Sequence, residues 1–256
     1  MTVNILAVGD VYGNSGVEKL RKTLPELRAL RDIAFCVVNG ENAAGNGAAP
    51  EHCEEMFRAG ADVITLGNHT WGKRELWRYL DENRFILRPA NFAPQVPGRG
   101  WGVFDSAFGD VCVINLIGRC EMHVGPDNPF FEADRIIKNC DCKIKLVDFH
   151  AELTSEKQSM AYHLDGRVSA LWGTHTHVQT SDAAVFPQGT GYITDLGMTG
   201  AKRSVIGIKP EYALSRFLGN PPERFEEAGG KAKLEGAIFE IDPGTGKCVG
   251  AEALRL

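Results

Sequence analysis

The sequence has no excess of basic residues and no apolar run long enough to cross a membrane. Its 256 residues include 28 lysines and arginines against 33 acidic residues, which gives a formal net charge of -5. A protein of this charge has no long-range attraction for a polyanion, so we expect no binding of long DNA or RNA. A small phosphate ligand stays compatible with it. Residues 1–5 form neither a basic nor an extended apolar segment, and we therefore expect a soluble, cytoplasmic protein without membrane contact.

A disulfide pattern is also lacking. The seven cysteines are an odd number, and Cys140 and Cys142 have a spacing typical of neither a zinc site nor a thioredoxin motif. A chain of this length with 43% hydrophobic residues buries a large core without disulfides, so we predict seven free thiols. No repeat, low-complexity tract or linker divides the sequence. We predict one domain over residues 1–256.

Short apolar runs alternate with amphipathic segments, a pattern typical of a layered α/β domain. The predicted strands are 4–8, 35–38, 62–66, 85–87, 111–117, 144–147, 168–172, 192–194, 236–241 and 249–254. The predicted helices are 17–31, 51–59, 73–82, 131–139 and 211–218. Pro25 predicts a kink or an early break in the first of these helices.

Two histidines one residue apart, His175 and His177, follow the predicted strand 168–172. Gly173 lets the backbone turn sharply at that point, so each imidazole can offer a ring nitrogen to a metal ion. A single His-x-His pair is more often an ordinary surface or core feature than a metal site. The prediction therefore depends on whether other strand ends supply ligands.

Four more strand ends do supply them. Carboxylate, amide and imidazole side chains follow the apolar runs, namely Asp10, Glu41, Asn42, Asn68, His69 and His150. Each alone has an ordinary explanation as a helix cap, a turn residue or a core histidine. Because the carboxyl ends of the strands in an α/β sheet share one edge, where ligands bind, five such ends predict one site.

The side chains of this predicted site suit manganese, iron or zinc, because they offer oxygen and imidazole nitrogen but no thiolate. The predicted metal ligands are Asp10, Glu41, Asn42, Asn68, His150, His175 and His177. These seven groups exceed one coordination shell, so we predict two ions. Two ions about 4 Å apart, bridged by a carboxylate and a hydroxide, form the usual clamp for displacement at phosphorus.

Several motifs carry a family resemblance over nearly the whole chain. They are Gly9-Asp10, Asn39-Gly40-Glu41-Asn42-Ala43-Ala44, Gly67-Asn68-His69-Thr70-Trp71, Arg88-Pro89-Ala90-Asn91-Phe92, Asp148-Phe149-His150-Ala151-Glu152, Gly173-Thr174-His175-Thr176-His177 and Thr194-Asp195-Leu196-Gly197-Met198-Thr199-Gly200. In this order they resemble the motifs of calcineurin-like metallophosphoesterases, and more narrowly those of the bacterial YmdB-type branch.

The resemblance implies a four-layer α/β/β/α sandwich, oligomeric assembly, and a di-iron or manganese phosphodiesterase that acts on 2',3'-cyclic nucleotides. One metal would be held by Asp10, Glu41, Asn42 and His177, and the other by Glu41, Asn68, His150 and His175. Glu41 would bridge them. A bridging hydroxide would attack phosphorus, and His69 would act as the general acid that protonates the leaving ribose oxygen.

Three residues depart from the broader family. Tyr12 stands where a histidine is usual, Glu41 replaces a bridging aspartate, and Thr70 follows His69 where an acidic residue is common. Asn42 is the natural substitute for the missing histidine ligand. The sequence identifies no partner that orients His69.

Other interpretations stay open. The same metals would serve a phosphomonoesterase or phosphoprotein phosphatase, or a weakly catalytic protein that binds a nucleotide as a signal. Asp148 and Glu152 are either acceptors for imidazole N–H groups or solvated charges. Segment 119–130 is either a wall that selects the substrate or an ordinary surface loop, and Trp71 either stacks on a base or packs below the site.

Overall fold

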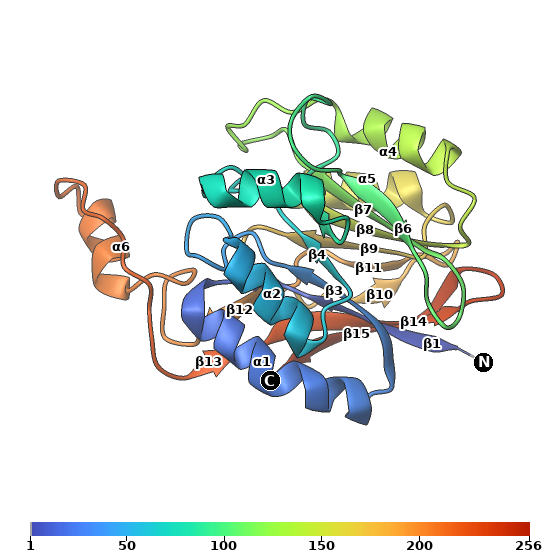
Figure 1. The fold of residues 1–256 in the computed structure, drawn as a ribbon, viewed down its shortest axis with the longest axis horizontal. Coiled ribbons are helices and arrows are strands. Elements are labelled where there is room, and N and C mark those ends of the chain that lie inside the picture. Colours follow the sequence, from blue (N-terminus) through green and yellow to red (C-terminus); the bar gives the residue numbers. More distant parts are fainter. Residues whose placement is uncertain (1) are drawn as a thin grey trace.

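A computed structural model of the chain describes residues 2–256 (Figure 1). The helices are α1 (Gly13–Leu30), α2 (Pro50–Ala59), α3 (Arg74–Glu82), α4 (Pro129–Lys138), α5 (Thr154–Leu164) and α6 (Pro210–Phe217). The strands are β1 (Val3–Val8), β2 (Asp10–Val11), β3 (Ile33–Asn39), β4 (Val63–Thr65), β5 (Ile86–Leu87), β6 (Trp101–Phe104), β7 (Val111–Ile117), β8 (Ile144–His150), β9 (Ala170–Thr174), β10 (Ala184–Val185), β11 (Gly191–Ile193), β12 (Met198–Ala201), β13 (Ala232–Lys233), β14 (Glu235–Asp242) and β15 (Lys247–Arg255).

Within the described residues these strands form three sheets. One six-stranded sheet has the order β15-β14-β1-β3-β4-β5, the other has the order β10-β11-β9-β8-β7-β6, and β13-β12-β2 form a small third sheet. In the first sheet β1, β3, β4 and β5 run parallel, and in the second sheet β7, β8, β9 and β11 do. Parallel strands bring their carboxyl ends to one edge, and the predicted site residues follow those ends.

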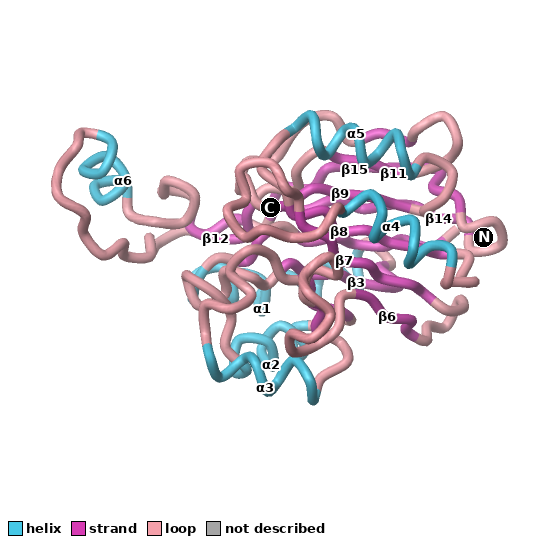
Figure 2. The backbone as a smooth tube through the Cα atoms, turned by 90° about the horizontal axis from the view of Figure 1, so that it is seen from above, coloured by secondary structure: helices cyan, strands magenta, loops and turns pink. Residues whose placement is uncertain are grey.

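Three apolar clusters hold the layers together. The two large sheets pack face to face through side chains such as Val37 and Leu146, and the rings of Trp172 and Phe239 stack 5.8 Å apart between them. Helices α1, α2 and α3 cover the outer face of the first sheet, while α4 and α5 cover that of the second (Figure 2). The central strands of both sheets, such as β3, β7 and β8, are thus buried on two faces, which explains their continuous apolar runs.

The predicted strands are confirmed in position, but one predicted helix needs correction and a further helix was not predicted. Helix α1 starts at Gly13 and continues through Pro25 to Leu30, so the early break is wrong. Proline removes one backbone hydrogen bond. Leu20, Leu24 and Leu27 are buried on both sides of it, and this burial holds the two halves against the sheet.

Helix α5 is absent from the helices predicted from the sequence. Its buried positions are Lys157, Met160, Ala161 and Leu164, which follow the helical spacing only if the lysine is counted among the inward-facing residues. A lysine at such a position reads as a surface residue in the sequence, because a charged side chain is rarely buried without a partner. The partner, Asp195, is distant in the sequence and is described with the site below.

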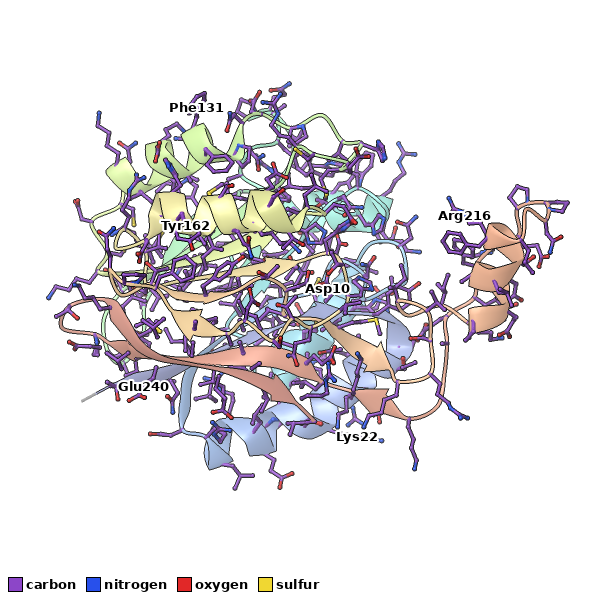
Figure 3. The ribbon with its side chains drawn as sticks, turned by 180° about the vertical axis from the view of Figure 1, so that it is seen from behind. Asp10, Lys22, Phe131, Tyr162, Arg216 and Glu240 are labelled. Atoms are coloured by element: carbon purple, nitrogen blue, oxygen red, sulfur yellow. The ribbon has the colours of Figure 1, made fainter. Side chains whose placement is uncertain are left out.

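One segment leaves the body of the protein. Residues 202–231, which we call the arm, carry α6 and extend away from the sheets (Figures 1 and 3). Strands β12 and β13 pair antiparallel at the base of the arm, with Gly200 opposite Lys233 and Ala201 opposite Ala232. This pairing holds the two ends of the arm together.

The seven cysteines are free, as predicted. Among residues 2–256 no helix has both the length and the apolar character that a membrane span requires.

Candidate active site

The eight predicted site residues lie together at the carboxyl ends of the strands. Asp10 follows β1, Glu41 and Asn42 follow β3, Asn68 and His69 follow β4, His150 ends β8, and His175 and His177 follow β9. The structure therefore brings together side chains separated by up to 167 residues of sequence, from Asp10 to His177. The separate strand ends contribute to one cluster, as the sheet topology requires.

One group of four centres on His150. Its Nε2 lies 2.9 Å from Asn68 Oδ1, 3.2 Å from Glu41 Oε1 and 3.1 Å from His175 Nδ1. The carboxylate of Glu41 and the rings of His150 and His175 each present an atom to a common point, all within 4.8 Å of one another. These atoms match the donor set that borderline cations prefer.

A second group of side chains adjoins the first. His177 Nε2 lies 3.7 Å from Asp10 Oδ1 and 3.2 Å from Asn42 Nδ2, and the same amide nitrogen lies 2.9 Å from Glu41 Oε1. The Asn42 oxygen faces His69 instead. Oxygen ligation by Asn42 would require a 180° turn of its amide, which exchanges the two atoms at the same positions.

The negative charge of the cluster is not fully compensated by the side chains around it. Asp10 is fully buried, and its Oδ1 has no hydrogen-bond partner within the part of the chain that the structure describes. A buried carboxylate oxygen without a partner is costly. The facing ring nitrogens of His150 and His175 are 3.1 Å apart, so only one of them can carry a proton. A cation bound by both nitrogens would take the place of that proton. The residues present therefore fit bound cations.

The pKa values of these groups indicate the same shortage of positive charge. Burial raises the pKa of Asp10 to about 6, and burial with the neighbouring His150 lowers the pKa of His175 to about 3. Burial disfavours protonated His150, yet the carboxylates of Glu41 and Asp10 outweigh it and raise its pKa to about 9. For Glu41 burial opposes ionisation, but His150 and His69 hold its pKa below the usual range. A proton on His150 thus occupies the place of a cation.

Hydrogen bonds behind the cluster fix the ring of His150. Its Nδ1 donates to Thr174 Oγ1 at 2.9 Å, and this hydroxyl donates to Asp148 Oδ1 at 2.7 Å. Asp148 also accepts from Asn39 Nδ2 at 3.1 Å and from Thr65 Oγ1 at 2.5 Å. Asp148 is fully buried. Its carboxylate orients the ring of His150 through the hydroxyl of Thr174, so that Nε2 of His150 faces the cluster.

Glu152 serves His175 directly, because its Oε2 lies 3.1 Å from His175 Nε2 and leaves Nδ1 facing the cluster. The loop that carries the two histidines has an unusual backbone. His175 and His177 both have positive φ, 99° and 63°, a conformation that costs about 1–3 kcal/mol for a residue with a side chain. The loop is therefore held in place by other contacts.

Asp195 and Lys157 hold this loop. Asp195 Oδ2 accepts from Thr176 N at 3.2 Å and from Thr176 Oγ1 at 2.7 Å, and Lys157 Nζ lies 2.7 Å from the same oxygen. Both charged side chains are buried. Asp195 lies within one of the motifs that carry the family resemblance, but it was not among the predicted site residues. No local signal marks Lys157, because a lysine reads as a surface residue until its distant partner Asp195 is known.

The arm contacts the cluster through His177. The carbonyl of Ile206 accepts from His177 Nδ1 at 2.9 Å, which turns His177 Nε2 toward Asp10. Ile206 itself has φ of 48°, rare for a β-branched residue. Tyr12, which stands at the position of a usual histidine, packs its ring edge against His177 with centroids 5.8 Å apart.

The structure identifies the partner that orients His69. Asn42 Oδ1 lies 2.8 Å from His69 Nδ1, while the backbone amide of His69 donates to Glu41 Oε2 at 3.1 Å. Thr70 instead donates to the carbonyl of Gly67, so it closes the turn. The side chain of His69 is 40% exposed, and burial lowers its pKa. Within residues 2–256 its Nε2 has no hydrogen-bond partner.

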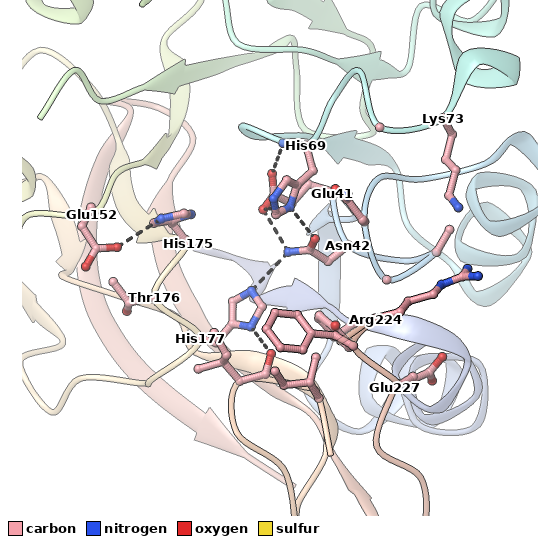
Figure 4. A pocket seen from close by; sticks show the side chains of 18 residues that line it. Glu41, Asn42, His69, Lys73, Glu152, His175, Thr176, His177, Arg224 and Glu227 are labelled. Carbon is pink, nitrogen blue, oxygen red and sulfur yellow. Dashed lines mark hydrogen bonds and ion pairs between the residues drawn. The ribbon is translucent and has the colours of Figure 1, made fainter. Parts of the chain in front are cut away.

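A cavity of about 860 Å³ opens over the cluster (Figure 4). Glu41, Asn42, His69, His175 and His177 form part of its lining, and residues 206, 208, 224, 225 and 227 of the arm form another part. No residue of segment 119–130 lines it, so the arm takes the place that we considered for that loop.

Trp71 is also absent from the lining of the cavity. It packs against Trp77 and Phe92, at centroid distances of 6.2 and 5.9 Å. The packing interpretation of this residue is therefore the one that the structure supports.

Comparison with known proteins gives consistent results. The model of the family described as YmdB-like protein matches residues 6–254. A 2',3'-cyclic-nucleotide 2'-phosphodiesterase of Bacillus subtilis is 41% identical over 98% of this chain and 96% of its own length. A crystal structure of a hypothetical protein from Thermus thermophilus is 36% identical, with a TM-score of 0.93 and coverage of 99% of both chains.

A second crystal structure, described as a novel phosphatase from Mycoplasma pneumoniae, is 34% identical. Its TM-score is 0.94, and the match covers 100% of this chain and 94% of that one.

Proposed function

This chain belongs to the YmdB-like protein family, and from that membership we propose that it is a metal-dependent phosphodiesterase acting on 2',3'-cyclic nucleotides. The observation that carries the proposal is the cluster of buried and half-buried carboxylate, amide and imidazole groups beneath an open cavity. The name of the B. subtilis relative supports the substrate class. The cavity volume of about 860 Å³ is within the usual range for small-molecule sites, about 300–1,000 Å³.

The chain would hold two transition-metal ions, iron or manganese before zinc. Asp10, Glu41, Asn42 and His177 would hold one, and Glu41, Asn68, His150 and His175 the other. When bound, the ions would neutralise charge on the phosphoryl oxygens and activate a water molecule. Asp148, Thr174 and Glu152 keep the imidazoles in the tautomers that such binding needs.

His69 would be the general acid. It is adjacent to Asn68 in the chain and lines the cavity. With the Asn42 amide turned as oxygen ligation requires, the amide nitrogen would donate to His69 Nδ1, so the imidazole proton would be on Nε2, which is free to meet a substrate. The leaving ribose oxygen needs a proton, which Nε2 would supply. The burial that lowers the pKa of His69 favours release of that proton.

Three further features belong to the proposal. The apolar clusters between and outside the two large sheets support a four-layer α/β/β/α sandwich. A single domain over residues 1–256 is supported by the neighbouring positions of β1 and β14, from opposite ends of the chain, in one sheet. Homo-oligomeric assembly is supported by the arm, on which Leu214 is 59% and Phe217 is 85% exposed.

The test uses purified full-length protein stripped with a chelator and reconstituted with manganese or iron. We expect close to two ions per chain and hydrolysis of 2',3'-cyclic nucleotides and bis-p-nitrophenyl phosphate in preference to p-nitrophenyl phosphate. Preference for the monoester would instead indicate a phosphomonoesterase. Tight nucleotide binding without turnover of either compound would indicate a regulatory protein.

A further inference from the structure

The cavity that covers the metal cluster has a second charged region, which the proposed mechanism does not use. Lys73, the residue before α3, and Arg224, on the arm, both line the cavity. Figure 4 shows their charged groups pointing toward one another, on the side of the cavity away from His175. Lys73 is half-buried and Arg224 is exposed.

These two cations have no partner within residues 2–256, whereas each carboxylate that lines the cavity has one. Glu41 contacts His150 and His69, and Glu152 contacts His175 at 3.1 Å. Glu227 accepts from the backbone amide of Ser15 at 3.0 Å, which caps the start of α1. The carboxylates are therefore engaged elsewhere, and only the positive charges are free to meet a ligand.

Two like charges that face each other repel, and an anion between them removes that repulsion. Lysine and arginine together suit a phosphate, because arginine offers a fork of N–H donors and lysine a compact charge. The formal net charge of the chain is -5, so two unpaired cations in one cavity are not the consequence of a generally basic surface.

We propose that Lys73 and Arg224 form a subsite for a second phosphate of the substrate, one nucleoside away from the diester that is cleaved. The proposal rests on the proposed function and specifies its substrate class. Two substrates carry that chemistry. One is a 2',3'-cyclic nucleotide with a 5'-phosphate, and the other is a short oligoribonucleotide that ends in a 2',3'-cyclic phosphate.

The kinetic test compares three substrates on the manganese-loaded enzyme. They are 2',3'-cyclic AMP, its 5'-phosphorylated form, and a diribonucleotide ending in 2',3'-cyclic phosphate. We expect kcat/KM to be about 10-fold or more higher for at least one substrate with a second phosphate. The better of the two identifies whether the subsite takes a terminal phosphate or an internucleotide linkage. Equal values for all three would overturn the proposal.

Two variants and two matched controls test the residues. Lys73→Gln and Arg224→Gln should each lower the ratio of kcat/KM values, second-phosphate substrate over 2',3'-cyclic AMP, by about 10-fold. Arg74→Gln and Arg203→Gln remove the same charge beside Lys73 and on the arm, but neither residue lines the cavity. They should leave the ratio unchanged. An equal fall in all four variants would reduce the effect to general electrostatics and refute the subsite.

A binding measurement separates this proposal from the proposed function. Adenosine 3',5'-bisphosphate should bind about 10-fold or more tightly than adenosine 3'-monophosphate in titration calorimetry, and Lys73→Gln should remove the difference. If no cyclic nucleotide is hydrolysed but this difference is present, the proposed function fails and the subsite stands. If cyclic nucleotides are hydrolysed and the two ligands bind equally, the subsite fails alone.

Discussion

The cluster beneath the cavity, which we call the floor, includes Asp10, Glu41 and His150, and these three residues have no exposed surface. Arg224 and Phe225, at the outer wall of the cavity, are exposed residues of the arm. The floor residues follow strands of two packed sheets. Several hydrogen bonds fix Glu41 and His150, and the backbone amide of His175 donates to Asp10 Oδ2. The wall residues lie on a segment that returns to the body mainly through β12, β13 and a few contacts near Ile206 and Glu227.

This difference shows which part of the site must hold its side chains in precise positions. Chemistry at phosphorus needs groups held within a fraction of an ångström, and packed strands supply that. Recognition of the remainder of a substrate tolerates a mobile wall, and exposed loops are where such variation is accommodated. Substitutions at the floor should therefore abolish function, while substitutions at the wall should adjust it.

The largest effect is expected at Glu41. Because its carboxylate contacts both groups of predicted ligands, Glu41→Ala should lower the affinity of both ions together and reduce kcat by about 1,000-fold or more. Metal content after dialysis and turnover of 2',3'-cyclic AMP measure this. A variant that keeps one ion at unchanged affinity would show that Glu41 is not shared.

His69→Ala should keep both ions and lower kcat by about 100- to 10,000-fold with a ribose leaving group. The loss should shrink sharply with bis-p-nitrophenyl phosphate, because p-nitrophenolate leaves without a proton. Parallel assays on the two substrates, with metal analysis, check this. Loss of metal, or an equal loss on both substrates, would make His69 a ligand or a positioning residue.

Thr174→Val should weaken metal binding by about 10- to 100-fold, since it removes the hydroxyl between His150 and Asp148. Chelator competition measures the affinity. Thr174→Ser keeps the hydroxyl and should restore most of it. If serine does not restore binding, the methyl group of Thr174 matters and the hydrogen bond does not.

Gly207→Ala tests the link between floor and wall. A Cβ at Gly207 would lie 2.4 Å from the ring of Tyr12, so the turn that carries Ile206 must shift away from His177. We expect metal affinity to fall several-fold, toward about 10-fold. Gly219→Ala is the matched control on the arm, because its φ is also positive, 81°, but a Cβ there has no atom within 4 Å. Equal effects of both variants would refute the link.

The smallest effect on stability is expected at the end of the arm. Phe217 is 85% exposed, so Phe217→Ala should change the free energy of unfolding by less than about 0.5 kcal/mol. Leu24→Ala, at a fully buried position of α1, should cost about 2–5 kcal/mol. Light scattering of the Phe217→Ala protein then measures whether it still self-associates. An unchanged mass of an oligomeric protein would exclude Phe217 from the contact between copies.

The residues of the floor could be found from the sequence because each follows an apolar strand directly. Asp10, Glu41, Asn68 and His175 share that local position, and the rule that parallel strands end at one edge brings them together. The chemistry of their side chains then indicates borderline cations. No contact between distant residues has to be known for this step.

The sequence by itself determined the layered α/β class, the positions of most strands, and the side chains that converge on the site, because these follow from local hydrophobic periodicity and strand ends. Only the tertiary structure decided the rest. The buried pair of Lys157 with Asp195, the orientation of His69 by Asn42, and the wall formed by Arg224 each join residues that no local pattern connects. Burial and partners of polar groups are properties of the packed chain, so they become visible only once the sheets and the arm are in place.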